Sequence, residues 1–161
     1  MLHEIKKINT YKQKKYQLEY FSIYGKNYWH KRYYVGKLYD ILLERMDYKN
    51  VNINHVEMPT YKNHEKFIVS KPYKVWNIIH VLGVPRKVIG TYYITKNNEI
   101  GIFIFKHYQG LGYGDIVMER ILELHKRKKL VANININNNI SRKFFEKHGF
   151  EPKSITYMLP T

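Results

Sequence analysis

The feature that most constrains this chain is a glycine-rich turn between an apolar run and an amphipathic run. Residues 99–105 alternate as a strand does, and residues 115–128 place apolar side chains at helical spacing. Between them, residues 109–114 read Gln-Gly-Leu-Gly-Tyr-Gly. Glycine permits positive φ and a close approach of the backbone to a ligand. Successive N–H groups ahead of a helix bind anions, so the turn predicts a phosphate or pyrophosphate site.

The spacing of the turn excludes two common nucleotide motifs. A dinucleotide fold requires G-x-G-x-x-G after the first strand of a βαβ unit, whereas this turn reads G-x-G-x-G and comes late in the chain. A nucleoside-triphosphate loop ends in G-K-[ST], whereas this one continues as Gly114-Asp115. The anion therefore belongs to another class of ligand.

Periodicity elsewhere predicts a mixed sheet covered by helices, of the α/β (α+β) class. The expected strands are residues 16–23, 75–82, 87–94, 99–105, 130–136 and 155–159. The expected helices are residues 31–46, 59–71, 115–128 and 141–148. Neither a linker nor a repeat interrupts the chain, so residues 1–161 are expected to form one domain.

Composition limits the chemistry. The 161 residues include no cysteine, which excludes disulfides and thiolate catalysis, and the histidines lack metal-ligand spacing, so no metal is expected. No run of about 18 apolar residues is present, which argues against a membrane segment. The absence of cysteine fits a cytoplasmic protein. The net charge of +15 attracts phosphates. Nucleic acid is therefore a possible partner, although excess lysine is equally consistent with a solvated surface.

Two motifs together resemble the GNAT acyltransferase superfamily. Residues 109–114 match its phosphate-binding signature, [QR]-x-x-G-x-[GA], and residues 138–150 are similar to its N-x-x-A-x-x-x-Y-E-K-x-G-F pattern. The resemblance covers about residues 75–159. It implies a twisted, mostly antiparallel sheet of six to seven strands flanked by about four helices. It also implies that residues 75–161 form a cofactor-binding core and residues 1–74 an acceptor side.

The same resemblance implies acetyl-coenzyme A as co-substrate and a primary amine of a small molecule or nucleotide-linked sugar as acceptor. Backbone groups of Phe103 and Ile104 would pair with the pantetheine arm, while Asn138, Ser141 and Phe145 would lie along the cofactor. The pyrophosphate would be held by the turn, that is by Gln109, Gly110, Leu111, Gly112, Tyr113 and Gly114. A monomer or a homodimer fits this family.

The catalytic groups are less evident. Glu99 opens the fourth strand and is the candidate base that takes a proton from the amine. Phe145 stands where many family members have a tyrosine acid, and phenylalanine donates no proton. Three alternatives remain open: the thiol leaves unaided, Tyr157 or Tyr108 supplies the proton, or the protein only binds coenzyme A.

Residues 24–34 are dense in aromatic and basic side chains. Such a segment packs well in a core, and it also stacks on bases and contacts phosphates. An acceptor made of nucleic acid or protein is therefore an alternative to a small amine. His64, on the helix expected over residues 59–71, is a candidate acceptor contact on the same side.

Overall fold

The computed structural model describes residues 17–25, 28–48, 57–83, 85–126 and 129–157. Along the chain, the elements are β1 (Leu18–Ser22), α2 (Tyr28–Met46), α3 (Tyr61–Val69), β2 (Tyr73–Val81), β3 (Lys87–Thr95), β4 (Ile100–Ile104), a 3-10 turn (Lys106–Tyr108), α4 (Tyr113–Leu124) and α5 (Asn139–Lys147). The α/β pattern expected from the sequence is confirmed for all four helices and for the first four strands.

The four strands form one antiparallel sheet in the order β1-β2-β3-β4. In the centre of the sheet Trp76 lies opposite Tyr93, and Tyr93 lies opposite Gly101. The tight connections between β2, β3 and β4 follow from the Gly-Val-Pro-Arg and Asn-Asn turns between apolar runs. Because β4 is last in the strand order, it lies at an edge of the sheet.

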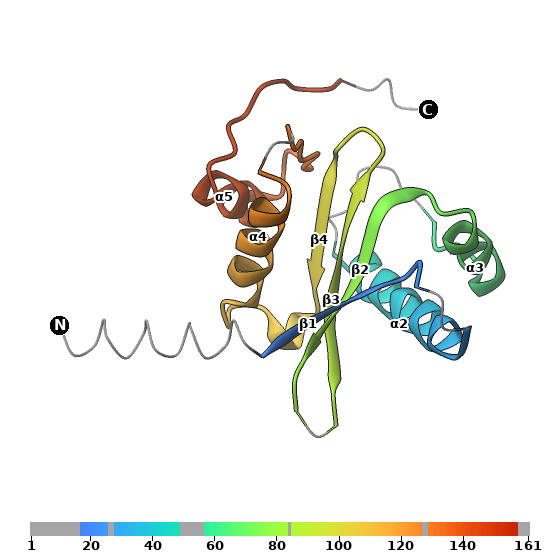
Figure 1. Ribbon diagram of the computed structural model, residues 1–161. Coiled ribbons are helices and arrows are strands. Elements are labelled where there is room, and N and C mark those ends of the chain that lie inside the picture. Colours follow the sequence, from blue (N-terminus) through green and yellow to red (C-terminus); the bar gives the residue numbers. More distant parts are fainter. Residues whose placement is uncertain (1–16, 26–27, 49–56, 84, 127–128, 158–161) are drawn as a thin grey trace, which may run out of the picture.

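Helices cover both faces of this sheet (Figure 1). The helices α2 and α3 lie on one side, and α4 and α5 lie on the other. Each layer has its own apolar core. On the α4 side, Ile116, Val117 and Ile121 are fully buried against inward-facing strand residues, while on the α2 side Val35 and Leu38 pack with Trp76 and Ile78.

The sheet is smaller than expected, with four strands in place of six or seven. Residues 130–136 make only one parallel bridge, between Val131 and Glu99, before leaving the edge of β4. Residues 155–157 form no strand, because Ile155 and Tyr157 are 64% and 90% exposed and bury no apolar face. The rest of that expected strand, and Tyr16 of the first one, lie outside the described residues.

The described helices include none that is both long enough and apolar enough to cross a membrane.

Candidate functional site

The glycine-rich turn has the backbone geometry that its sequence predicts. Gly110 and Gly112 adopt φ values of 72° and 83°, in the left-handed region where glycine is favoured. A Cβ atom at either position would meet nothing within 4 Å, so the outer side of the turn is open. Gly112 is the N-cap of α4 and offers no side chain to its N–H groups. Donors at the start of a helix attract an anion to this point.

The third glycine of the turn has a packing role. A Cβ on Gly114 would lie 3.3 Å from the ring of Phe144, so its absence lets α5 approach the first turn of α4. Leu111 is 47% exposed, and Tyr113 packs at the edge of the α4-side core. Only the first two glycines therefore need the left-handed conformation.

Gln109 connects the turn to the end of β4. Its side-chain Nε2 donates a hydrogen bond of 2.8 Å to the carbonyl oxygen of Ile104. This bond fixes the turn beside the open edge of the strand. The phosphate-binding role expected for Gln109 stays a prediction, while its structural role is visible.

The hydrogen bonds of β4 show which backbone groups face the open edge. Glu99 accepts a bond from Thr95, and Phe105 donates one to Ile89, so the odd-numbered residues of this strand face β3. Because strands alternate, the backbone groups of Ile102 and Ile104 point away from the sheet. The backbone groups at the open edge of β4 therefore include those of Ile102, and not those of Phe103 as the sequence analysis expected. The side chain of Phe103 instead faces the α2 side of the sheet.

Beyond Val131 the chain separates from β4, and a cavity of about 270 Å³ opens between the sheet, the α2–α3 layer and α5. Its wall on the α5 side includes Asn138, Ser141 and Phe145. Asn138 also caps α5, because its side chain accepts a 3.0 Å hydrogen bond from the backbone N–H of Ser141. These three residues, expected along a cofactor, are brought together on one wall.

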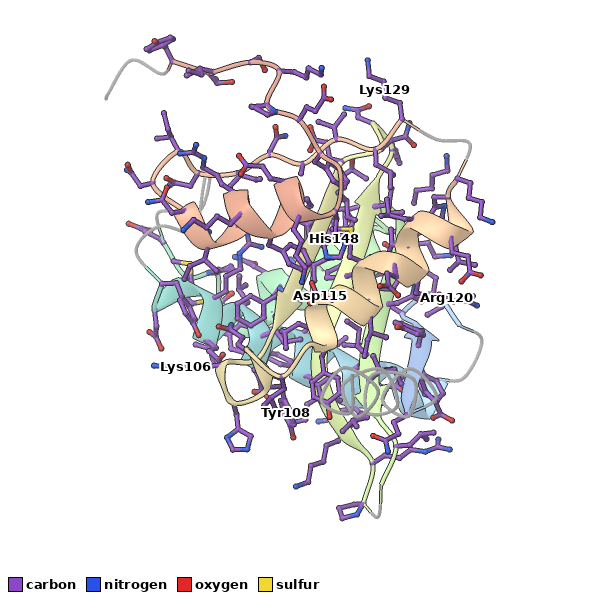
Figure 2. The ribbon with its side chains drawn as sticks, turned by 90° about the vertical axis from the view of Figure 1, so that its left-hand side faces the viewer. Lys106, Tyr108, Asp115, Arg120, Lys129 and His148 are labelled. Carbon is purple, nitrogen blue, oxygen red and sulfur yellow. The ribbon has the colours of Figure 1, made fainter. Side chains whose placement is uncertain are left out.

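Asp115, the first acidic residue after the turn, is neutralised locally (Figure 2). Its carboxylate lies 2.7 Å from the Lys147 ammonium and 2.9 Å from Nε2 of His148, both at the end of α5. Burial alone would raise the pKa of Asp115, but the hydrogen bonds from Lys147 and His148 outweigh it and hold this pKa below its usual value. The Lys147 ammonium offsets a negative charge that would otherwise repel an anion in the turn.

The structure separates the two candidate catalytic residues. The backbone of Glu99 hydrogen bonds with Thr95. Strand alternation puts the Glu99 side chain on the same face as Gly101 and Phe103. Unlike those two residues, Glu99 does not line the cavity. Tyr157 lies in the exposed segment after α5 and is not a cavity residue. Its catalytic role stays a prediction.

One hydroxyl group that the sequence did not reveal lies inside the cavity. The ring of Tyr93 occupies the space that a Cβ on Gly101 would fill, so its hydroxyl reaches over β4. The ring is held by a parallel stack on Tyr73, with 4.2 Å between the ring centroids. Only the register of β3 against β4 reveals this pairing, because residues 93 and 101 carry no motif.

His64 is buried and lines the cavity from α3, with its ring 5.5 Å from that of Tyr39. The side chains of residues 28–31, in the centre of the aromatic and basic segment, lie outside the described residues. Among the residues that the structure describes, no group of three His, Cys, Asp or Glu side chains could hold a metal ion.

Comparison with known proteins points to one family. Residues 75–152 match the acetyltransferase (GNAT) domain model. Among curated proteins, none matches this chain.

Solved structures have a similar fold. A domain from Methanocaldococcus jannaschii is 23% identical, with 84% of this chain and 89% of that chain covered and a TM-score of 0.69. Spermidine N-acetyltransferase from Vibrio cholerae, solved with CoA and spermine, is 13% identical, with 86% and 83% covered and a TM-score of 0.65. A predicted acetyltransferase from Clostridium acetobutylicum, solved with acetyl-CoA, is 14% identical, with 89% and 96% covered and a TM-score of 0.60.

The turn, the separation of the chain from β4 and the matched segment agree: residues 75–152 match the acetyltransferase (GNAT) domain model, and the chain shares its fold with these solved structures.

Proposed function

We propose that this protein transfers the acetyl group of acetyl-coenzyme A to a primary amine of a small molecule. The observation that carries the proposal is the placement of the positive-φ turn at Gly110 and Gly112 after the end of β4, the strand whose residues Ile102 and Phe103 line the cavity. The solved relatives from Vibrio cholerae and Clostridium acetobutylicum, which hold CoA or acetyl-CoA, support it.

Each part of acetyl-coenzyme A has a complementary group. The N–H groups of residues 110–114 bind the pyrophosphate at the start of α4. The outward backbone groups of Ile102 and the N–H of Ile104, whose carbonyl oxygen accepts from Gln109, pair with the amides of the pantetheine arm, as an added strand would. The wall made by Asn138, Ser141 and Phe145 limits the other side of this arm. The layer of α2 and α3 then faces the acceptor.

In the reaction, the neutral amine nitrogen attacks the thioester carbonyl carbon. A C–N bond forms, the C–S bond breaks, and the sulfur leaves with the electron pair and is protonated. Glu99 accepts the proton from the amine, directly or through water, because its side chain shares a face with the cavity residues Gly101 and Phe103. The Tyr93 hydroxyl, positioned over Gly101, donates toward the sulfur in place of the donor that Phe145 lacks.

A second candidate function is binding of coenzyme A without catalysis, and Phe145 is the observation that favours it. Phe145 is 9% exposed and packs against Phe144 and Phe150, so this position serves the core. Release of free thiol from acetyl-coenzyme A in the presence of amines distinguishes the two functions. An enzyme releases it continuously, whereas a binding module does not.

The cofactor site is tested by exchanging Gly112 for aspartate and, as a matched control, for asparagine. Both side chains tolerate positive φ and have almost the same shape, so they differ mainly in charge. Acetyl-coenzyme A at about 100 times its dissociation constant should stabilise the parent by roughly 2.7 kcal/mol in thermal unfolding. Gly112→Asn should retain most of this gain and Gly112→Asp should lose it, because the carboxylate repels the pyrophosphate. A parent protein that gains nothing from acetyl-coenzyme A contradicts the proposal.

A further inference from the structure

The acceptor side of the cavity has an unusual balance of charge. Among the described residues that line the cavity, Arg45 carries the one permanent charge, and none is Asp or Glu. Two segments that the structure does not describe, residues 49–56 and 158–161, contain no acidic residue in their sequence. Glu99 is the acid that shares this face, and it does not line the cavity.

Three aromatic side chains pack together in this wall. The rings of Phe67, Tyr73 and Trp76 meet edge to face, with 5.8 Å between Phe67 and Tyr73 and 4.7 Å between Tyr73 and Trp76. Trp76 is held by a 3.1 Å hydrogen bond from its Nε1 to Thr91. Such a wall favours a flat or apolar group, because rings gain from stacked and edge-to-face contacts.

Arg45 is positioned beside this wall, in the last turn of α2. Burial raises the pKa of Tyr73, and the positive charge of Arg45 offsets part of that rise, so the two side chains are electrostatically coupled. A guanidinium beside an apolar surface binds carboxylate or phosphate oxygens well, since its planar donors match them in pairs.

A polyamine or an amino sugar with several ammonium groups would find no carboxylate among the described residues that line this cavity. Each additional ammonium requires a carboxylate or a similar acceptor when it leaves water. In this cavity the second charge of such a substrate would meet Arg45 and no lining carboxylate. The spermine-bound relative from Vibrio cholerae therefore shares the fold but is a poor guide to the acceptor.

We propose that the acceptor is a primary amine on a flat, apolar body that also carries an oxyanion, and that Arg45 binds this oxyanion. The inference deepens the proposed acetyl transfer and rests on it. The aromatic wall of Phe67, Tyr73 and Trp76 holds the apolar body, and the amine reaches β4 on the face that Gly101 and Glu99 share. The net charge of +15 acts in the same direction, because it attracts anionic molecules to the surface.

Three acceptors with the same ring test the proposal: tyramine, L-tyrosine and O-phosphotyramine. The first carries no oxyanion, the second a carboxylate and the third a phosphate. Release of coenzyme A from acetyl-coenzyme A is measured with each, with spermidine as the polycationic comparison. Thermal stabilisation by each acceptor is measured in the presence of coenzyme A. We expect kcat/KM for at least one anionic acceptor to exceed that for tyramine and for spermidine by tenfold or more.

Variants of Arg45 connect this preference to the side chain. Arg45→Gln should remove the tenfold preference by raising KM for the anionic acceptor, and should leave KM for acetyl-coenzyme A unchanged. Arg45→Glu should reverse the preference, toward tyramine and spermidine. Arg32→Gln changes the same charge at an exposed position of α2 and is the matched control, with no effect expected on the preference.

The outcomes separate the two proposals. A parent protein that gains no stability from acetyl-coenzyme A, or does not turn it over, contradicts the proposed function. If the parent binds and uses acetyl-coenzyme A but treats the three ring acceptors alike, or prefers spermidine, the inference about the acceptor is overturned and the proposed function stands. A change in KM for acetyl-coenzyme A in Arg45→Gln would also overturn it, by placing Arg45 against the cofactor.

Discussion

The two helical layers of this protein are specified in different ways. On the α4 side, local backbone requirements define the site: positive φ at Gly110 and Gly112, an N-cap at Asn138 and a close helix contact at Gly114. On the α2 side, the cavity wall is built by side chains from separate elements, such as Tyr93 of β3, which stacks on Tyr73 of β2. The first kind of site leaves a motif in the sequence, whereas the second leaves only a set of apolar and aromatic residues.

The two layers also suit different roles in binding substrates. A backbone site can hold the part of a substrate that never changes, because N–H groups are the same whatever the side chains. A side-chain wall can be altered one residue at a time, which suits the part of the reaction that selects the acceptor. Four variants test whether the two layers divide the work in this way.

The largest effect is expected on the acceptor side. Tyr93→Phe should lower kcat by about 100-fold, or roughly 2.7 kcal/mol in the barrier, because a positioned proton donor is lost. The ring and its stack on Tyr73 remain, so KM for acetyl-coenzyme A should be unchanged. Steady-state kinetics of thiol release provide the measurement. If Tyr108→Phe shows this loss and Tyr93→Phe does not, the donor lies on the cofactor side and the division of roles fails.

Gly101→Ala should destabilise the fold by about 2 kcal/mol in urea unfolding, because the new Cβ overlaps the ring of Tyr93 and forces it from its stack on Tyr73. Gly36→Ala in α2 is the matched control. No atom lies within 4 Å of the Cβ position there, and alanine is the better helix former, so this variant should gain stability. Equal behaviour of the two variants would show that Tyr93 is not held in place by the missing Cβ.

On the cofactor side, Asn138→Ala should cost about 1 kcal/mol of stability through loss of the α5 cap. Asn137→Ala, one residue earlier and exposed, should cost little. Thermal unfolding with and without acetyl-coenzyme A separates two roles of Asn138. A cap alone lowers both melting temperatures equally, whereas a cofactor contact also reduces the shift between them.

The smallest effect concerns the contact of Asp115 with Lys147 and His148. The pKa of Asp115 is lowered in the folded state, so its stabilisation is fully present above the ordinary value of 3.8 and is lost as the pH falls through the lower folded value. Asp115→Asn should therefore cost about 0.5 kcal/mol at neutral pH, a small amount because the Lys147 side chain is 63% exposed and water screens its charge. Urea unfolding across pH should show this difference disappearing below that range. A difference that persists in acid would mean that the contact is not electrostatic.

Much of the fold could be predicted from periodicity, but the outer strands could not. Residues 130–136 are rich in apolar side chains and so indicated a strand, yet after Val131 they leave β4 and line the cavity. Residues 155–157 have strand-forming side chains, but none of the described residues pairs with them. Alternation shows that a segment can lie on a sheet, whereas pairing depends on what occupies the next position in space.

The sequence by itself determined the glycine-rich turn, its place between a strand and a helix, and the match of residues 75–152 to the GNAT domain model, because these depend on local φ angles and N–H groups that only certain residues provide. The tertiary structure alone decided that Ile102 faces the open edge, that Tyr93 reaches over Gly101, and that Arg45 is the single permanent charge among the described residues of the cavity wall. Each of these depends on strand register or on helices packed across the sheet. Register and packing are set by burial of the whole core, so no short segment of the chain encodes them.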